Sequence, residues 1–296
     1  MALALITSLM VYYGYLSNNN NGEESQMRPV FLASCLALFA ASTASANDST
    51  AAFGVGGLVF TKSEHIVMQA EDLFISKDKI RVAYQFYNSS DKPITTRVAF
   101  PLPEVILEAD GSSIPYYTEE TLPKDKNILK FSVTIDGKKQ PFESEDKKRF
   151  DKDVQAYAHK ITHHWMQTFP AKKIVSVVHE YTPGVGGSVE YGMQDEASGK
   201  FCIDQDLQSW MKQLEKTNYK VSTDVIEYIL TTGANWKGPI GKFKLTVKKS
   251  DPNEKLSFCG SGVKKIDART FVMEKTNFTP TKDLHILYLK PYSLGS

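Results

Sequence analysis

Apolar and polar side chains alternate along several short stretches of this chain. The alternation is clear at residues 80–86, and it resumes at residues 94–100 after a turn-forming segment at 88–93. A period of two residues is typical of a strand with one buried face, so we expect two such strands joined as a hairpin. Pro101 and Pro103 cannot donate to a sheet ladder, and they end the second strand.

Two further stretches have strand patterns. Residues 131–135 alternate up to Asp136-Gly137, a dipeptide suited to a tight hairpin turn. Residues 174–181 are apolar on both faces, which predicts a central strand covered on both sides. Short strands joined by turn signals at this spacing indicate a mainly β fold, a β-sandwich with minor helices.

Two segments have helical periodicity instead. Residues 146–161 carry one apolar stripe at helical spacing, formed by Phe150, Val154, Tyr157, Ala158 and Ile161. Residues 205–216 place Leu207, Trp210, Met211 and Leu214 on one face, and Asp204 precedes them in the position of an N-cap. The sequence therefore predicts two helices among the strands.

Two glycine-rich and polar segments, 183–188 and 192–200, divide the chain. The strand signals before this division predict a β-sandwich domain at residues 47–198. The second predicted helix and the strand-like runs that follow it predict a smaller α+β half at residues 199–296. No internal repeat is visible in either part.

The front of the chain has the pattern of a secretory signal peptide. Residues 27–46 contain one positive charge, an apolar run and a small-residue site that ends at Ala46, so we expect cleavage after Ala46. The asparagine-rich, acidic stretch before them does not suit a signal peptide, and we expect translation to start at Met27. Residues 1–46 are thus interpreted as a leader and signal peptide.

Two other interpretations of this region stay open. Residues 1–16 are apolar enough for a membrane anchor, although a span requires roughly 20 residues. Cys35 follows a short apolar stretch as a lipid attachment site would, but the apolar run continues beyond it. After residue 46, no apolar run is long enough to cross a membrane.

Charge and cysteine content narrow the possible partners. The chain has 35 Lys and Arg against 34 Asp and Glu, and removal of residues 1–46 leaves 34 against 32. This near-neutral balance without a basic stripe argues against nucleic acid as a partner. Cys202 and Cys259 remain in a chain bound for an oxidising compartment, so we expect one disulfide between them, although a metal or redox pair is the alternative.

Several segments follow one another along the chain: Gly56-Gly-Leu58, Glu71-Asp-Leu-Phe-Ile-Ser76, Phe100-Pro-Leu-Pro103, Trp165-Met-Gln-Thr-Phe-Pro170, His179-Glu-Tyr-Thr-Pro183, Ile229-Leu-Thr-Thr-Gly-Ala-Asn-Trp236 and Ser257-Phe-Cys259. In this order they resemble the segments of a bacterial exported family, DUF4424. The resemblance covers essentially all of residues 47–290 and, with the signal peptide, implies a periplasmic location. It implies no known activity and no catalytic residues. A looser resemblance to inter-alpha-trypsin-type β-sandwich modules of extracellular proteins suggests a binding role.

The segment AHKITHHW, residues 158–165, contains three of the six histidines. On the predicted helix, His159 and His163 lie opposite the apolar stripe and face solvent, whereas His164 lies near the stripe. His159 and His163 are weak candidates for metal ligands, with His179 or a carboxylate as a third, because structural zinc needs four ligands. We expect no metal and no cofactor. His179 is expected to be a hydrogen-bonded structural residue.

Two other features bear on function. Trp236, in a loop of glycine and proline, either plugs one end of the sandwich, which we favour, or stacks on a ligand such as a sugar.

Acidic clusters occur at Glu119-Glu120 and at residues 143–146, but the sequence does not pair them across a cleft. We therefore expect a non-enzymatic binding or envelope-associated module with a periplasmic protein or glycan as its partner. A hydrolase that acts on a cell-envelope polymer through paired carboxylates is the alternative.

Overall fold

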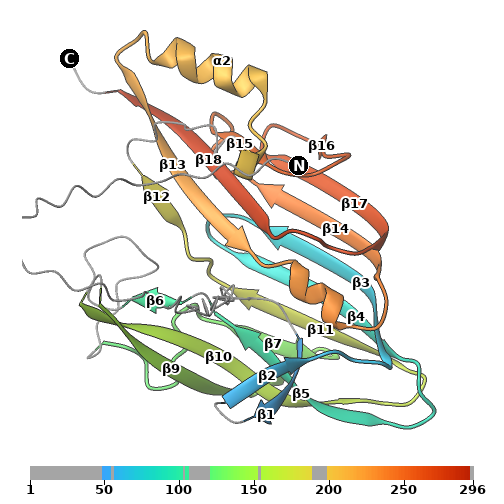
Figure 1. The fold of residues 1–296 in the computed structure, drawn as a ribbon. Helices are drawn as coiled ribbons and strands as arrows, with labels where there is room; N and C mark the ends of the chain where they lie inside the picture. The colour runs from blue at the N-terminus through green and yellow to red at the C-terminus, as the bar shows by residue number, and fades with distance from the viewer. Residues whose placement is uncertain are drawn as a thin grey trace, which may run out of the picture. The chain divides into compact units, whose positions relative to one another are not determined.

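The computed structural model describes residues 49–54, 57–102, 104–106, 121–152, 155–188 and 199–293. Strands dominate these residues and form three sheets (Figure 1). The predicted mainly β, sandwich-like fold is thereby confirmed. The leader, the signal peptide and its cleavage site lie outside the described residues, as do Glu119 and Glu120. Among the helices that the structure describes, none has the length and apolar character needed to cross a membrane.

Each sheet draws strands from separate parts of the chain. The six-stranded sheet contains β1 (Ser49–Gly54), β2 (Gly57–Thr61), β5 (Ile94–Pro101), β6 (Val105–Ile106), β9 (Glu143–Asp151) and β10 (Ala156–Phe169). The eight-stranded sheet has the order β16 (Lys264–Lys265), β17 (Thr270–Phe278), β14 (Ile240–Lys248), β3 (Ile66–Ile75), β4 (Ile80–Asn88), β11 (Ile174–Tyr181), β7 (Ser132–Ile135) and β8 (Lys138–Gln140). The four-stranded sheet has the order β12 (Gly186–Ser188), β13 (Tyr219–Tyr228), β18 (Leu284–Ser293) and β15 (Lys255–Phe258).

The two smaller sheets share one face of the eight-stranded sheet. On β4, the side chains of Tyr84 and Phe86 both point to this buried face. The Phe86 ring lies 5.9 Å from the ring of Phe169 in the six-stranded sheet. The Tyr84 hydroxyl lies 3.3 Å from that of Tyr228 in the four-stranded sheet. Both smaller sheets therefore pack on the same side of the larger one.

The opposite face of the eight-stranded sheet carries exposed polar side chains. Asp72, Gln85 and Lys244 point outward from adjacent strands and are exposed. The strand at residues 174–181 lies centrally in this sheet, but the prediction that it is covered on both sides is wrong. Ile174 is 51% exposed, because its side of the sheet has no second layer among the described residues.

A helix covers the outer face of the four-stranded sheet. Helix α2 (Gln205–Leu214) begins after Asp204, whose side chain accepts a hydrogen bond from the Leu207 amide at 2.8 Å, as expected for an N-cap. Its apolar side packs with Leu287 and Leu289 of β18 in a second, smaller core. The alternate residues of β18, such as Ile286, face the main core. This sheet is consequently apolar on both faces.

The two halves expected on either side of residue 199 share the eight-stranded sheet. Strand β14 pairs in parallel with β3, with Leu245 opposite Leu73, and places β17 and β16 beyond it. Residues Thr43–Ser296 form one compact unit. Strands from the second half of the chain thus complete a sheet that the first half begins.

The predicted hairpin of residues 80–100 is wrong, because β4 and β5 belong to different sheets. Asn88 accounts for the difference. Its side-chain amide donates hydrogen bonds to the carbonyl oxygens of Lys92, at 2.8 Å, and Phe169, at 2.9 Å. These bonds tie the turn to the end of β10, so the chain passes from one sheet to the other instead of folding back.

The hairpin predicted at Asp136-Gly137 is confirmed. Strands β7 and β8 pair directly, with Ile135 opposite Lys138. Asp136 and Gly137 have φ values of 49° and 77°. Two successive positive φ values are what a type I′ turn requires, and glycine adopts this conformation without a steric cost.

A β-bulge in β3 turns a carboxyl group into the core. The pairing of β3 with β4 shifts between Met68 and Ala70. Before the bulge Met68 points into the core, and after it Glu71 does. A Cβ atom at Gly241 on the neighbouring β14 would lie 2.6 Å from the Gln69 carbonyl oxygen. Glycine at position 241 therefore allows the bulge to approach β14.

Glu71 is 1% exposed, and its carboxyl group lies beside the Tyr228 hydroxyl. The Tyr228 hydroxyl donates to Oε1 at 3.5 Å, whereas Oε2 has no hydrogen-bond partner among the described residues. Burial raises the pKa of Glu71 to about 8, and the Tyr228 hydrogen bond offsets only part of this rise. The carboxyl group is therefore protonated at neutral pH.

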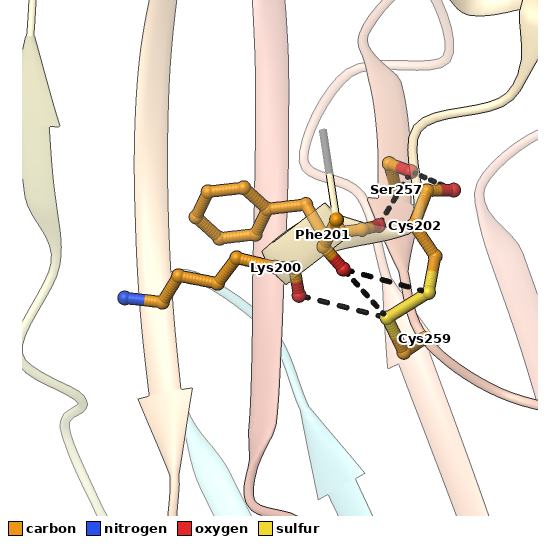
Figure 2. Close-up of a disulfide and its surroundings, with 6 residues drawn as sticks. Lys200, Phe201, Cys202, Ser257 and Cys259 are labelled. Carbon is orange, nitrogen blue, oxygen red and sulfur yellow. Dashed lines mark hydrogen bonds between the residues drawn. A yellow bond between two sulfur atoms is a disulfide. The ribbon is translucent and has the colours of Figure 1, made fainter. Parts of the chain in front are cut away.

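A disulfide joins Cys202 to Cys259, the pairing expected from the sequence, with an Sγ–Sγ distance of 2.02 Å. Figure 2 shows it beside the Phe201 backbone, whose carbonyl oxygen accepts a hydrogen bond from the Ser257 hydroxyl at 2.9 Å. The bond connects the segment before α2 to the end of β15. The disulfide thereby links the segment that leads into α2, which packs on the four-stranded sheet, to β15 of that sheet.

We expect Glu71→Gln to remove a pH dependence of stability. The pKa of Glu71 is raised from 4.5 in the unfolded chain to about 8, so its contribution is complete below pH 4.5 and is lost as the pH rises to 8. Across this window the variant should gain roughly 4 kcal/mol of unfolding free energy relative to the wild type. Urea unfolding at a series of pH values measures the difference, and Asp72→Asn, on the exposed side of the same strand, should show no such trend.

Removal of the disulfide should lower the free energy of unfolding by about 4 kcal/mol, because the bond closes a loop with a sequence separation of 57. The comparison is between the wild type and the Cys202→Ser, Cys259→Ser double variant in denaturant. Addition of a reductant should bring the wild type to the stability of the variant and leave the variant unchanged. If the wild type and the double variant were equally stable without reductant, the expectation would be contradicted.

Candidate binding pocket beside the histidine-rich strand

The helix predicted at residues 146–161 is wrong, because this segment forms most of the β9–β10 hairpin. The apolar residues of the supposed stripe meet across the hairpin instead. Phe150 is the register partner of Tyr157, and their rings lie 5.3 Å apart. An aromatic cross-strand pair of this kind stabilises a sheet, and its spacing in the sequence also suits a helix.

His159 and His163 face the interior, so the prediction that they face solvent is wrong. Both are 0% exposed, because they lie on the inward face of β10. Four residues along a strand span roughly 13 Å, too far for both imidazoles to bind one ion. The described residues contain no group of three or more His, Cys, Asp or Glu suited to a metal ion.

The two imidazoles have separate hydrogen-bond partners on β9. His159 Nδ1 lies 2.9 Å from an Asp146 carboxylate oxygen. His163 Nδ1 lies 2.8 Å from the Ser144 hydroxyl oxygen, and this hydroxyl donates to the Asp125 carbonyl oxygen at 2.7 Å. Because the single hydroxyl proton goes to Asp125, His163 Nδ1 must carry the proton that Ser144 accepts. His163 Nε2 is then the bare nitrogen.

His163 Nε2 is buried and has no hydrogen-bond partner among the described residues. The ring of His163 packs between Phe142, at a centroid distance of 4.6 Å, and Phe131, at 5.3 Å. Burial lowers the pKa of His163 to about 4, since a second proton would place a charge among aromatic rings. The imidazole is therefore neutral at neutral pH.

His179 lies in the same aromatic cluster. Its ring is 0% exposed and contacts Phe131 and Trp165, at centroid distances of 5.1 Å and 5.5 Å. Burial alone lowers the pKa of His179 to about 3. The neighbouring Glu180 points to the outer face, where it forms an ion pair with Lys79. Both buried histidines thus belong to the packing between the six- and eight-stranded sheets.

A pocket lies at the start of β9, beside the other face of β10. In the register of the sheet, His164 is opposite Glu143 of β9, and Met166 is opposite Arg97 of β5. The cavity has a volume of about 240 Å³, slightly below the roughly 300–1,000 Å³ typical of ligand pockets, so it suits only a small molecule or the end of a larger one. It is lined by Arg97, Gln140, Pro141, Phe142, Glu143, His164, Trp165 and Met166.

Charges of both signs flank His164 in this pocket. Burial lowers the pKa of His164, and the nearby Arg97 guanidinium lowers it further, whereas Glu143 and Glu145 act in the opposite direction. A neutral imidazole between a cation and an anion can both donate and accept a hydrogen bond. Met166, which is 53% exposed, adds an apolar surface at the mouth. The pocket therefore suits a ligand with separated charges and an apolar part.

Trp236 does not line this pocket. It follows the 3₁₀ helix η1 (Thr231–Asn235) and is 1% exposed. Its ring packs on Phe86 at a centroid distance of 4.4 Å and on Phe169 at 6.2 Å. Trp236 therefore fills the core instead of offering a surface for ligand stacking.

The acidic residues occupy different environments. Glu143 lines the pocket, while Asp146 lies on the inner face beside His159. A second acidic pair, Asp224 and Glu254, is bridged by the Lys77 ammonium at 2.8 Å and 2.5 Å. This lysine neutralises the two carboxylates and ties the eight-stranded sheet to the four-stranded one.

Sequence reasoning missed Arg97, Met166 and the pocket itself. Arg97 and Glu143 lie far apart in the chain, and only the shared neighbour β10 brings them together. One signal was available, since extended backbone places His164 and Met166 on one face and His163 and Trp165 on the other. If residues 163–166 are extended, this alternation predicts that His164 and Met166 point away from the core.

Fold and pocket define this chain as a disulfide-bonded, sandwich-like β protein with a small cavity at a sheet edge. The family model described as "Domain of unknown function (DUF4424)" matches residues 46–155 and 143–287. The chain therefore belongs to the DUF4424 family. No curated protein matches it.

Among solved structures, a "putative nutrient binding protein" from Legionella pneumophila is similar with a TM-score of 0.51 and 19% identity, over 82% of this chain and 70% of that one. This likeness shows a shared fold. An M1 zinc metallopeptidase from Deinococcus radiodurans is also similar, with a TM-score of 0.32 and 8% identity over 77% of this chain and 43% of that one.

His163→Phe should make the protein more resistant to acid. The pKa of His163 is lowered from 6.5 in the unfolded chain to about 4, so the folded state loses stability as the pH falls through this window. Removal of the titrating group should reduce the loss by roughly 3 kcal/mol. The measurement is the unfolding free energy at pH values from 7 to about 4. His65→Gln, at an exposed histidine, is the matched control. If His163→Phe lost as much unfolding free energy on acidification as the wild type, His163 would not be the group responsible.

Proposed function

We propose that this protein is an exported, non-enzymatic binding protein of the periplasm. Its pocket would take a small ligand with a carboxylate, a cationic group and an apolar part, such as an amino acid or the end of a peptide. The observation that carries the proposal is the presence of Arg97 and Glu143 in one cavity with His164. A peptide end is one form of the periplasmic protein partner expected from the sequence, and a glycan is the other.

The complementarity of the pocket explains this choice of ligand. The Arg97 guanidinium is planar and suits a carboxylate, which it can hold through two parallel hydrogen bonds. Glu143 supplies the opposite charge for an ammonium group, and the side chains of Pro141 and Met166 provide apolar contact. A neutral sugar has no charged group to match Arg97 and Glu143.

Binding is better supported than hydrolysis. Glycoside hydrolysis usually requires two carboxyl groups on opposite sides of the substrate. Glu143 is the one carboxylate among the described residues that line the pocket. Asp224 and Glu254, the closest to such a pair, are held by Lys77. The description of the Legionella protein as nutrient-binding agrees with a ligand-binding role.

Export is supported by two features of the chain. Residues 27–46 have the charge, apolar run and small-residue site of a signal peptide. Cys202 and Cys259 form a disulfide, a bond that persists in oxidising compartments such as the periplasm.

The mature chain should bind at least one member of a panel of free L-amino acids and dipeptides in isothermal titration calorimetry. Arg97→Gln and Glu143→Gln should each weaken that binding at least tenfold, because a hydrogen bond to a charged group contributes roughly 1.5–3 kcal/mol. Lys244→Gln, on the outer face of the eight-stranded sheet, is the matched control and should bind as the wild type does. Thermal unfolding of each variant shows whether its fold is intact.

Two outcomes would contradict the proposal. One is affinity that is the same in both pocket variants and the wild type. The other is turnover of a peptide or glycan by the wild-type protein that Glu143→Gln abolishes, which would favour the hydrolase alternative.

A further inference from the structure

The disulfide lies at the surface, although the residues on either side of Cys202 are buried. Phe201 is 2% exposed and Ile203 is 7% exposed, and both pack with Leu287 and Leu289 of β18 in the smaller core. Cys202 itself is exposed, and Figure 2 shows the Phe201 ring and the sulfur atoms on opposite sides of the backbone. Thiol–disulfide exchange requires access to a sulfur atom. A thiol in solution can therefore attack this bond while the smaller core stays intact.

The backbone at Cys202 has a conformation that residues with a Cβ atom rarely adopt. Its φ is 52°, in the left-handed region, where the Cβ atom meets a steric cost. Such a conformation persists where the surrounding structure imposes it, and here Cys202 is bonded to Cys259, which directly follows β15. Exposed or strained disulfides are the ones that reducing thiols open most readily. Exposure and backbone conformation thus distinguish this bond from a buried structural disulfide.

Residues 201–214, here called the cover segment, are held to the four-stranded sheet by a small number of other contacts. Leu207 is the one buried residue of the ten in α2, and Trp210 is partly buried. The Ser257 hydroxyl is shared between the carbonyl oxygens of Phe201, at 2.9 Å, and Cys202, at 3.3 Å. Segments with few buried apolar contacts open locally more often than the central strands of a protein. Without the disulfide, the cover segment is therefore the part of this region that opens first.

We propose that the Cys202–Cys259 disulfide is a redox-sensitive switch, which a dithiol reductant opens in the folded protein to release the cover segment from the four-stranded sheet. One thiolate of the reductant attacks a sulfur atom of the bond and forms a mixed disulfide, while the other cysteine leaves as a thiolate. The second thiol of the reductant then displaces the first cysteine. Two electrons and two protons have passed to the two cysteines, and the reductant has become a disulfide.

Release of the cover segment changes one defined part of the surface. Leu287 and Leu289 pack with the cover segment, whereas Ile286 and Tyr288, the alternate residues of β18, belong to the main core. The main core therefore keeps its contacts when the cover segment leaves, and Leu287 and Leu289 become accessible. The ligand pocket is built on β5, β9 and β10 of the six-stranded sheet, so the switch does not depend on the proposed function.

Reduction of the folded mature chain by dithiothreitol tests the proposal. Without denaturant, iodoacetamide should label Cys202 and Cys259 faster than the protein unfolds globally. Native-state hydrogen exchange should then show that the reduced cover segment opens locally. Its amides should exchange about ten times faster or more than those of β11, with little dependence on urea, because a released helix of ten residues does not hold its structure in water.

The Cys202→Ser, Cys259→Ser variant is the matched control. Without reductant its cover segment should exchange as it does in the reduced wild type, and dithiothreitol should leave its exchange unchanged. In the oxidised wild type the same amides should exchange about ten times more slowly or less. Because the reduced wild type gives the same comparison, the test does not require that the double variant folds.

Three results would overturn the proposal. The first is labelling of the cysteines only at the rate of global unfolding, which would show that the folded protein protects the bond. The second is an unchanged exchange of the cover segment after reduction, which would show that apolar contacts alone hold it. The third is exchange of the reduced cover segment with the same rate and urea dependence as β11. In that case the disulfide would contribute to global stability without controlling a local opening.

Discussion

One face of the eight-stranded sheet must be covered, and the rest of the molecule is arranged to cover it. No single smaller sheet does so: the six-stranded sheet covers the part near β11 and β7, and the four-stranded sheet covers the part near β3 and β14. Trp236 packs against Phe86 and Phe169, which belong to two different sheets. Burial of this apolar area is the principal stabilising contribution, and it determines which side of each strand carries large side chains.

The same burial controls the protonation of the polar groups that the core encloses. Glu71 retains a proton because its carboxylate would be desolvated, and His163 and His179 give theirs up for the same reason. All three groups are therefore uncharged at neutral pH. Where charge is kept between layers, as at Lys77, it is paired with Asp224 and Glu254. The interior is consequently neutral from the bulge in β3 to the aromatic cluster around Phe131.

Local patterns predicted several local features of this chain correctly. The alternation at residues 80–86, the Asp136-Gly137 turn and the cap at Asp204 each involve residues close in sequence, and each prediction agrees with the structure. The failures concern partners that are distant in sequence. The turn after Asn88 leads to another sheet because of a contact with Phe169, and no local pattern shows that contact.

The segment at residues 146–161 failed for a related reason. Apolar residues spaced by three, four and seven positions suit a helical stripe, yet the same spacing lets Phe150 meet Tyr157 across a hairpin. The pocket was equally hidden, because Arg97, Glu143 and His164 converge only when β5, β10 and β9 are in register. The bulge that turns Glu71 inward depends in turn on Gly241, a residue from a distant strand.

The parallel pairing of β3 with β14 has a consequence for how the chain acquires its structure. The two strands come from nearly opposite ends of the described residues, and β14 supplies one whole side of β3. Contacts of such long sequence separation form late and slowly, because the entropy of closing the intervening loop must be overcome first. A chain that emerges from its amino terminus first therefore cannot complete its central sheet until residues 240–248 are available. Until then β3 has β4 as its one neighbour in the sheet, and its other side has no strand to pair with.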